Sequence, residues 1–170
     1  MPFSFPWTDV APPMLQRGSL QHVWRTRAEW TPQQWHLPMA VVVDGDIVGV
    51  QAMLAEHYPT LRTVSTGSWL GRRYQGKGIG TEMRSAILHL AFAGLGAEHA
   101  LTRAFVDNDA SLAVTRRLGY EDTGRQLVVR RDAPAWMLAF GLARSRWEER
   151  RRDDIVIVGL DACLELFGAR

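Results

Sequence analysis

The sequence predicts a single α/β domain in which strands and helices alternate after an opening hairpin. The chain has 170 residues, a length that favours one hydrophobic core. Hydrophobic residues make up 46% and charged residues 22%, an ordinary globular composition. A β-branched and aromatic run over Thr63–Leu70 leads through a glycine-rich turn into Gly80–Gly94, where apolar residues recur at the spacing of one helix face. We therefore expect residues 1–170 to be organised around this strand, turn and helix.

The residues before this unit predict an extended segment, a helix and a hairpin. Residues 1–18 hold four of the eight prolines, so we expect an extended segment lying against the body of the protein. Its aromatic residues Phe5 and Trp7 either line the mouth of a substrate groove or form ordinary hydrophobic contacts with the body of the protein. A helix is expected over Ser19–Trp30, with Ser19 as its N-cap. Strands are expected over Met39–Val43 and Ile47–Leu54, joined by a tight turn at Asp44-Gly45-Asp46.

The residues after the unit predict further strands around one short helix. Asn108 is a good N-cap for a helix over Asp109–Leu118, which Gly119 would end. The expected strands are His99–Val106, Gln126–Arg131 and Trp136–Ala143, and Asp153–Arg170 is expected to form a short strand and a final apolar turn or helix.

The glycine-rich turn is suited to binding an anion. It comprises Gln75, Gly76, Lys77, Gly78, Ile79, Gly80 and Thr81. Glycines at alternate positions let the backbone turn its N–H groups outward, with no Cβ to obstruct a ligand. The first N–H groups of a helix have no acceptor within it, and the helix dipole adds partial positive charge there. Since Arg72, Arg73 and Lys77 add full charges, we expect a cradle for a phosphate-bearing cofactor.

The turn also resembles a known family motif. Gln75-x-x-Gly78-x-Gly80 is similar to the Gln/Arg-x-x-Gly-x-Gly/Ala signature of the GNAT acyltransferases, whose loop holds the coenzyme A pyrophosphate. The resemblance implies a mixed, mostly antiparallel central sheet flanked by helices. Family members usually open with a strand that is not evident in this sequence, so the first strand is expected to be absent or replaced by residues 1–18.

A second motif lies downstream at the spacing that the family shows. Asn108-x-x-Ser111, followed by Leu118-Gly119-Tyr120, looks like the Asn-x-x-Ser…Leu-Gly-Phe/Tyr segment of the RimJ/RimL branch. The resemblance is close from about Ser65 to Tyr120.

This resemblance implies an acyl-CoA-dependent N-acyltransferase in which the acceptor amine attacks the thioester directly. The implied pyrophosphate site is the backbone from Gln75 to Thr81, with Arg73 beside it. Pantetheine would run along Thr63–Leu70, so that Trp69 and Leu70 face it and an N–H near Leu70 meets the thioester oxygen. The next strand would splay away to make room. Asn108 and Ser111 would bond to the cofactor from the other side, although both residue types also suit a helix start.

The implied catalytic residues are less complete than the cofactor site. Many relatives carry a Glu where this chain has Ser65 and Thr66, and a Tyr where it has Thr115. Ser111 is the candidate proton donor to the leaving thiolate, with Tyr74 and Tyr120 as the alternatives, although Tyr120 is expected to be a core residue. Glu56, beside His57, is the nearest candidate general base, with an ordinary loop residue and proton removal by water as the alternatives.

The resemblance implies acetyl-CoA as the default donor, and succinyl-CoA is the alternative because some family members of wider donor choice carry a run similar to that from Ser65 to Gly71. Acceptors in this branch range from protein N-termini and lysines to small amines. The vacant Glu and Tyr positions favour a rival function, a non-catalytic acyl-CoA-binding sensor or assembly subunit.

Composition and charge indicate which other partners to expect. The net charge of +2 is too mild to predict a nucleic-acid partner. No apolar stretch approaches the roughly 20 residues of a membrane span, and the N-terminus does not resemble a secretory signal, so we expect a cytoplasmic protein. One cysteine and scattered histidines predict no metal site. An exposed sheet edge would be a place for pairing into a homodimer.

Overall fold

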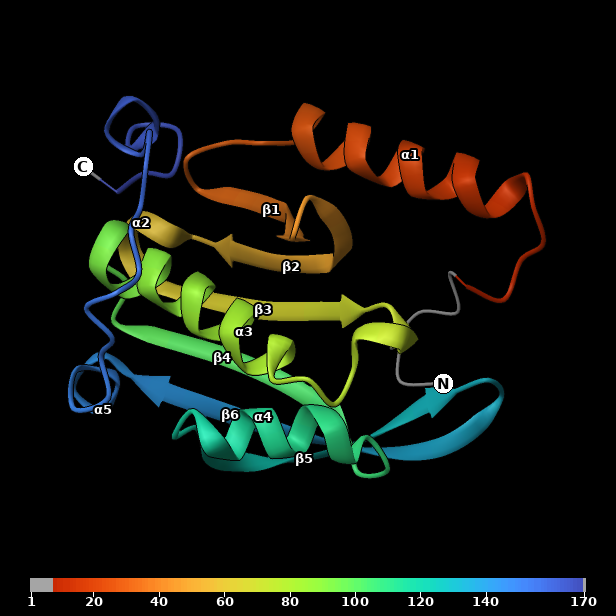
Figure 1. Cartoon of the computed structure of the whole chain (residues 1–170). Helices are drawn as coiled ribbons and strands as arrows, with labels where there is room; N and C mark the ends of the chain where they lie inside the picture. The colour runs from red at the N-terminus through yellow and green to blue at the C-terminus, as the bar shows by residue number, and fades with distance from the viewer. Residues whose placement is uncertain (1–7, 170) are drawn as a thin grey trace.

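The fold is a six-stranded sheet with helices packed over it (Figure 1). The computed structural model describes residues 8–169. The strand order is β1-β2-β3-β4-β6-β5, with bounds β1 Gln34–Val43, β2 Asp46–Glu56, β3 Thr63–Leu70, β4 His99–Phe105, β5 Glu121–Arg130 and β6 Ala133–Ala143. All neighbouring strands are antiparallel except β3 and β4, which are parallel. The expected mixed, mostly antiparallel sheet is confirmed.

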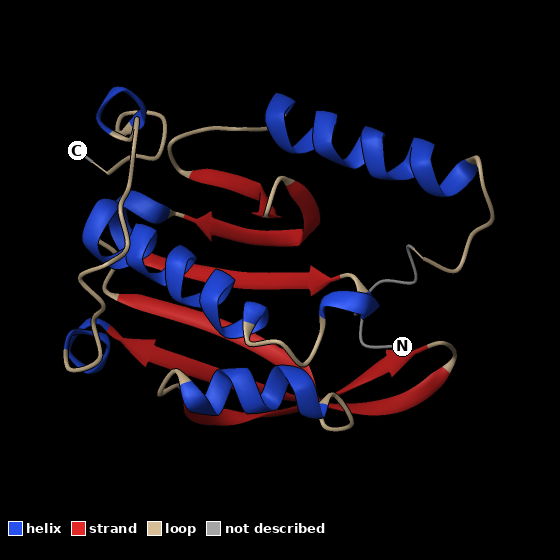
Figure 2. Ribbon diagram, in the orientation of Figure 1, coloured by secondary structure: helices blue, strands red, loops and turns tan. Residues whose placement is uncertain are grey.

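The helices that matter for the site, α3 and α4, lie over the same face of the sheet (Figure 2). The helical segments are α1 Met14–Ala28, α2 Tyr58–Leu61, α3 Ile79–His89, α4 Asp109–Arg117, α5 Arg144–Glu148 and the short turns η1 Arg72–Tyr74, η2 Leu90–Gly94 and η3 Asp161–Cys163. The π-helical turn η2 continues α3, so together they match the expected helix. Their apolar side, including Ile87, Leu88 and Phe92, is buried in the core of the sheet.

The opening hairpin forms as expected, but its first strand is longer. Asp44 and Gly45 take φ of 51° and 84°, the two left-handed positions of a tight two-residue turn. The strand β1 starts at Gln34 rather than at Met39, and Pro38 lies within it. Proline cannot donate a ladder hydrogen bond, but β1 is an edge strand and so tolerates it.

The predicted extended segment is wrong over its last residues. Helix α1 begins at Met14, so residues 14–18 are helical, and Ser19 lies inside the helix with its hydroxyl donating to the Leu15 carbonyl at 2.8 Å. Pro12 and Pro13 lie just before the helix, where proline is tolerated, so they do not prevent the residues after them from being helical. Phe5 and Trp7 lie outside the described residues. No strand precedes α1 between residues 8 and 13, so β1 is the first strand of the described chain.

The C-terminal half differs from the prediction in two places. Strand β5 begins at Glu121 instead of Gln126. The prediction started too late because the first seven residues of the strand are exposed and show no alternation of apolar and polar residues. The strand expected after Asp153 is wrong: residues 153–160 run irregularly across the helical layer. Two tryptophans anchor the C-terminal turn, since the Trp30 and Trp35 ring N–H groups donate to its carbonyls at 2.8 and 3.1 Å.

The contact between α1 and β1 predicts a pH dependence of stability. The His22 and His36 rings lie 5.3 Å apart, and burial together with the positive charge of His22 lowers the pKa of His36 below its ordinary 6.5. The unfolded chain therefore binds a proton at His36 more readily, and stability is lost as the pH falls through 6.5. We expect the urea midpoint to drop less between pH 7.5 and 5.5 in His36→Gln than in the wild type. An equal drop in both proteins would contradict the prediction, and exposed His99→Gln is the matched control.

The end of β3 is held in place by a close approach of β2. A Cβ built on Gly49 would collide with the Trp69 carbonyl oxygen and lie 3.1 Å from the Leu70 Cα, and both neighbours are backbone. We expect Gly49→Ala to lower the free energy of unfolding by about 1–3 kcal/mol, as overpacking does. Gly67→Ala is the control, because a Cβ there meets no atom within 4 Å. Chemical denaturation measures both, and equal effects would show that the crowding at Gly49 is relieved without cost.

Candidate functional site

An opening between two strands forms the centre of the candidate site. Strands β3 and β4 pair only where Thr63–Ser65 face His99–Leu101. Beyond these residues β3 remains paired with β2 as far as Leu70, and β4 with β6 as far as Phe105. The facing edges of β3 and β4 therefore separate, as the family resemblance implied. We call the gap between residues 66–70 and 102–105 the wedge.

The glycine-rich turn lies at the open end of the wedge, where β3 leads into α3. Gly76 and Gly78 take φ of 73° and 83°, and a Cβ on either would meet no atom of residues 8–169 within 4 Å. Gly78 is the N-cap of α3, and its carbonyl accepts the N–H groups of Thr81 and Glu82. The N–H groups of Ile79 and Gly80 precede the first bond of the helix and point away from it. This backbone fits an anion such as a pyrophosphate.

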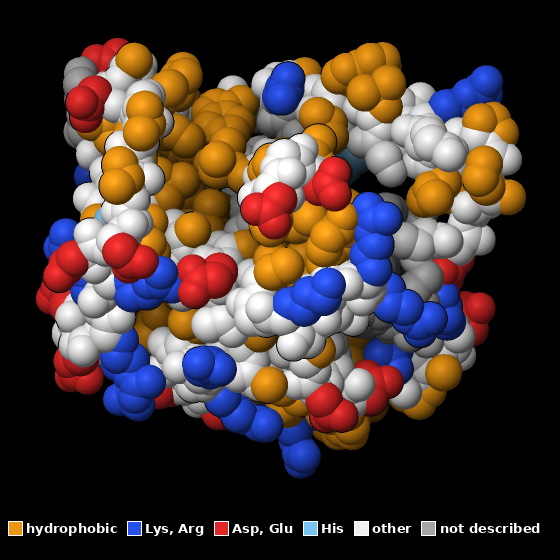
Figure 3. Space-filling model, in the orientation of Figure 1, with side chains coloured by type: hydrophobic (Ala, Val, Ile, Leu, Met, Phe, Trp, Pro, Cys, Tyr) orange, Lys and Arg blue, Asp and Glu red, His pale blue; other side chains and the backbone are white. Residues whose placement is uncertain are grey.

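Side chains of the turn tie it to the strands. Gln75 donates from Nε2 to the Leu70 carbonyl at 2.9 Å, so it acts as a brace between the turn and the end of β3. Tyr74 donates its hydroxyl to Asp46 at 3.1 Å. The charged groups of Arg73 and Lys77 lie 4.7 and 5.8 Å from the centre of the Tyr74 ring. Figure 3 shows basic side chains gathered where β3 enters η1 and α3, which favours a negatively charged ligand.

The start of α4 lies beside this turn. Asn108 caps the helix, since its Oδ1 accepts the Ser111 N–H at 3.2 Å, and its predicted cap role is confirmed. One helical turn further, a Cβ on Gly80 would lie 3.6 Å from Val114, so α3 and α4 meet at the glycine turn. The structure thus brings Asn108 and Ser111 to the neighbourhood of residues 75–81. Their bonds to a cofactor remain a prediction.

A buried polar cluster closes the inner end of the wedge, and the sequence analysis did not identify it. Arg84 of α3 is 4% exposed and reaches both strands, donating to Ser68 Oγ at 3.2 Å and to Thr102 Oγ1 at 3.3 Å. The Tyr120 hydroxyl lies 3.4 Å from Thr66 Oγ1 in the same cluster. These groups come from β3, β4, α3 and the loop after α4, and they converge about two strand residues further into the wedge than Leu70.

Tyr120 is held in its neutral form. Burial raises the pKa of its phenol, and the Arg84 guanidinium and the Thr66 hydroxyl only partly oppose that effect. A neutral phenol carries a proton that it can donate at working pH. Thr115, at the position where relatives carry a Tyr, is fully buried, and its hydroxyl has no hydrogen-bond partner in the described part of the chain.

The structure does not bring the candidate base to the wedge. Leu54 pairs with Ser65, so Glu56 lies still further toward the start of β3, at the opposite end from the glycine turn. It is exposed there, and its predicted role is not favoured by this position. Asp107 follows β4, but its bidentate contact with Arg130 at 2.6 and 2.9 Å lowers the pKa of its carboxyl. Asp107 is therefore a poor proton acceptor.

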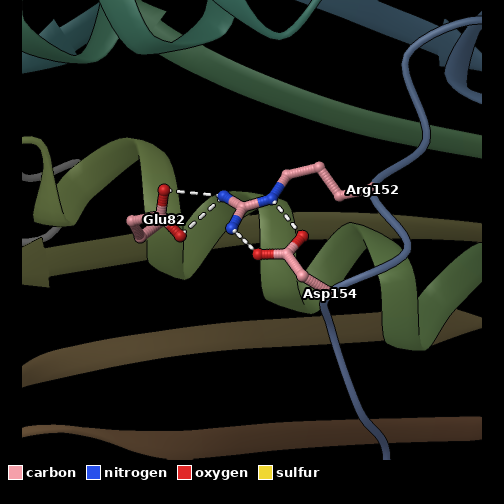
Figure 4. A network of polar contacts seen from close by, with 3 residues as sticks. All are labelled: Glu82, Arg152 and Asp154. Carbon is pink, nitrogen blue, oxygen red and sulfur yellow. Dashed lines mark hydrogen bonds and ion pairs between the residues drawn. The ribbon is translucent and has the colours of Figure 1, made fainter.

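The C-terminal segment contacts helix α3 through Arg152. Figure 4 shows its guanidinium between Glu82 of α3 and Asp154, with Nη1 2.6 Å from Glu82 Oε1. Its hydrogen bonds lower the pKa of Asp154 to about 2, so the contact persists through the neutral range. Arg152 also neutralises Glu82, the carboxylate in the first turn of the helix that would otherwise repel a bound anion.

Two further properties of residues 8–169 bear on the choice of ligand. This part of the chain groups no three metal-ligating side chains at one place. Within the same residues, none of the helices combines the length and the apolar character needed to cross a membrane.

Comparisons with known proteins agree with this geometry. Residues 1–121 match the model of the acetyltransferase (GNAT) domain family, which is most of the chain. The chain therefore belongs to the GNAT acetyltransferase family, and it is an enzyme of the N-acyltransferase class.

Solved structures show the same fold at low sequence identity. RimL, a ribosomal L7/L12 α-N-protein acetyltransferase solved with coenzyme A, has 16% identity and a TM-score of 0.68 over 85% of this chain and 80% of that one. Mycobacterium smegmatis RimJ, solved with a CoA disulfide, has 19% identity and a TM-score of 0.65 over 81% and 69%. Spermidine N-acetyltransferase SpeG from Vibrio cholerae has 12% identity and a TM-score of 0.66 over 79% of each chain.

Sequence reasoning missed Arg84 although a signal was present. Arg84 is followed at i+4 by Leu88 and at i+7 by Ala91, so it occupies the buried face of the predicted helix. A charged residue on an apolar helix face must find a partner in the interior. Tyr120 was noted in the motif but was expected to be core, and its burial at 6% exposure confirms that part.

Proposed function

We propose that this protein transfers an acyl group from acyl-CoA to a primary amine of a protein or small molecule in the cytoplasm, acting as one domain. Acetyl-CoA is the default donor, and succinyl-CoA is the alternative. The observation that carries the proposal is the open, positive-φ glycine turn at the mouth of a strand-bordered wedge. Such a turn offers backbone donors to a pyrophosphate, and the unpaired edge of β3 offers them to a pantetheine arm.

The proposed chemistry uses few protein groups. The turn from Gln75 to Thr81 and the flanking Arg73 and Lys77 hold the donor, with Trp69 and Leu70 beside its arm and Asn108 near its other side. The neutral amine attacks the thioester carbonyl directly, and the C–S bond breaks to release CoA as the thiol. Positioning of the two reactants supplies much of the rate enhancement. Ser111 or Tyr120 donates the proton to the sulfur, and water accepts the proton of the amine.

Ligand binding tests the cofactor assignment. We expect the thermal midpoint to rise with saturating CoA, acetyl-CoA or succinyl-CoA and not with ATP, because a ligand of the native state stabilises it by mass action. No rise with any CoA compound would overturn the proposal. Release of free thiol from acetyl-CoA with a panel of amines then separates the enzyme from a non-catalytic acyl-CoA-binding subunit, which would bind but show no turnover.

A further inference from the structure

Arg84 presents a buried positive charge that the protein itself does not neutralise. Its side chain is 4% exposed, and within residues 8–169 it forms no ion pair. Its hydrogen-bond partners Ser68 and Thr102 and the nearby Tyr120 all carry neutral hydroxyls. Nε is buried and has no hydrogen-bond partner among the residues that the structure describes. Buried charges in proteins are normally paired, so this arrangement suits an anion supplied from outside the chain.

The guanidinium lies beside the wedge, covered by only a thin layer of atoms. Its partner Ser68 is exposed, so the charge lies just beneath the surface on the helix-covered face of β3. Arginine has five N–H donors in a planar fork, and the bonds to Ser68 and Thr102 use two of them. The remaining donors include Nε–H, which belongs to the pair that binds a carboxylate in bidentate fashion. The two hydroxyls thus orient the fork and leave part of it unsatisfied.

The position of Arg84 relative to the proposed donor identifies the anion. The pyrophosphate turn lies beyond the end of β3, so the arm of the donor runs back along this strand and its acyl end points toward Ser68. Two residues of strand, from Leu70 to Ser68, span about 6.6 Å on the same face. An acyl chain with two methylenes and a terminal carboxyl carries its oxygens about 5 Å past the thioester carbon. An acetyl group is too short to reach the fork.

We propose that Arg84 recognises the terminal carboxylate of a dicarboxylic acyl-CoA donor, such as succinyl-CoA, at the inner end of the wedge. This inference rests on the proposed function and names its donor class. The polar cluster around Arg84 then determines donor specificity. An uncharged acyl chain of equal length leaves the buried fork unpaired and is bound less tightly.

Calorimetric titration with CoA, acetyl-CoA, succinyl-CoA and butyryl-CoA tests the proposal. Butyryl-CoA has the same four-carbon acyl chain as succinyl-CoA, with a methyl group in place of the terminal carboxylate. We expect the wild type to bind succinyl-CoA at least tenfold more tightly than butyryl-CoA, as a charged hydrogen-bonded pair provides. In Arg84→Met the two affinities should fall within threefold of each other, while the affinity for CoA itself is kept. Arg84→Lys keeps the charge without the fork and should retain only part of the preference.

The outcomes separate this inference from the proposed function. Binding of CoA and acetyl-CoA without a preference for succinyl-CoA over butyryl-CoA overturns the inference alone, and so does a preference that survives in Arg84→Met. Failure of all CoA compounds to bind overturns both. The wild-type comparison needs no variant, so it decides the matter even if Arg84→Met does not fold. Arg116→Met, which changes an exposed arginine of α4, is the control and should keep the wild-type preference.

Discussion

Replacing Gly78 by valine is expected to lower the affinity for CoA by about 100-fold or more. The φ of Gly78 is 83°, and a Cβ there would meet no atom of the described residues within 4 Å, so the valine side chain would occupy the place where the pyrophosphate is proposed to lie. The lost contacts are charge-assisted hydrogen bonds worth about 1.5–3 kcal/mol each. The strain of a left-handed valine adds only about 1–2 kcal/mol to the cost of folding. Isothermal titration with CoA measures the loss.

Gly96→Val is the matched control for this experiment. Gly96 has a φ of 74° and equally open surroundings, but it follows the last turn of the same helical segment, at the end far from the glycine turn. Backbone strain is therefore similar in the two variants, whereas only Gly78→Val blocks the proposed site. Comparable CoA affinity in both variants would refute the assignment of residues 75–81 as the pyrophosphate cradle.

The second large effect concerns the proton donated to the leaving thiolate. If Ser111 is the donor, Ser111→Ala should lower kcat by about 10²–10⁴-fold while the affinity for CoA changes little, since a general acid acts in the transition state. Its N–H caps the helix through Asn108 and is kept in alanine, so α4 should remain folded. Steady-state turnover of the donor at saturating amine provides kcat.

Tyr120→Phe supplies the competing measurement. Its hydroxyl lies at the inner end of the wedge, beside Thr66 and Arg84, and its raised pKa keeps it protonated. A large loss of kcat in Tyr120→Phe with near-normal turnover in Ser111→Ala would transfer the role to Tyr120 and contradict the prediction for Ser111. Since the ring is buried and phenylalanine preserves its packing, the comparison changes mainly the hydroxyl.

The sequence predicted the parts of the fold that depend on local patterns. Strand β3 has its predicted bounds, α3 begins within a residue of its predicted start, and the cap at Asn108 is confirmed because its side chain bonds within its own turn. The start of β5 could not be predicted, since its exposed polar residues become a strand only by pairing with β6. Likewise, the early part of β1 depends on β2 and on tryptophan contacts with the distant C-terminal turn.

The candidate site shows the same division. The glycine turn is a continuous segment whose chemistry can be inferred from its residue types and spacing. The Arg84 cluster is assembled from β3, β4, α3 and the loop after α4, and its Ser68 and Thr102 hydroxyls come from the two strands that part at the wedge. Glu56 was chosen as a candidate base for its proximity along the chain, and the antiparallel register places it at the end of β3 opposite the glycine turn, so its role stays a prediction.

The short ladder between β3 and β4 has a mechanical consequence. Only three residue pairs of β3 and β4 join the half of the sheet formed by β1, β2 and β3 to the half formed by β4, β6 and β5. The two three-stranded halves are therefore paired at one end only. Arg84 connects the two halves, because it donates hydrogen bonds to Ser68 on one and to Thr102 on the other. A pantetheine arm lying in the gap would supply the hydrogen bonds that the missing ladder lacks. A donor bound there as proposed would add a short strand between the two halves of the sheet and would be expected to stiffen it.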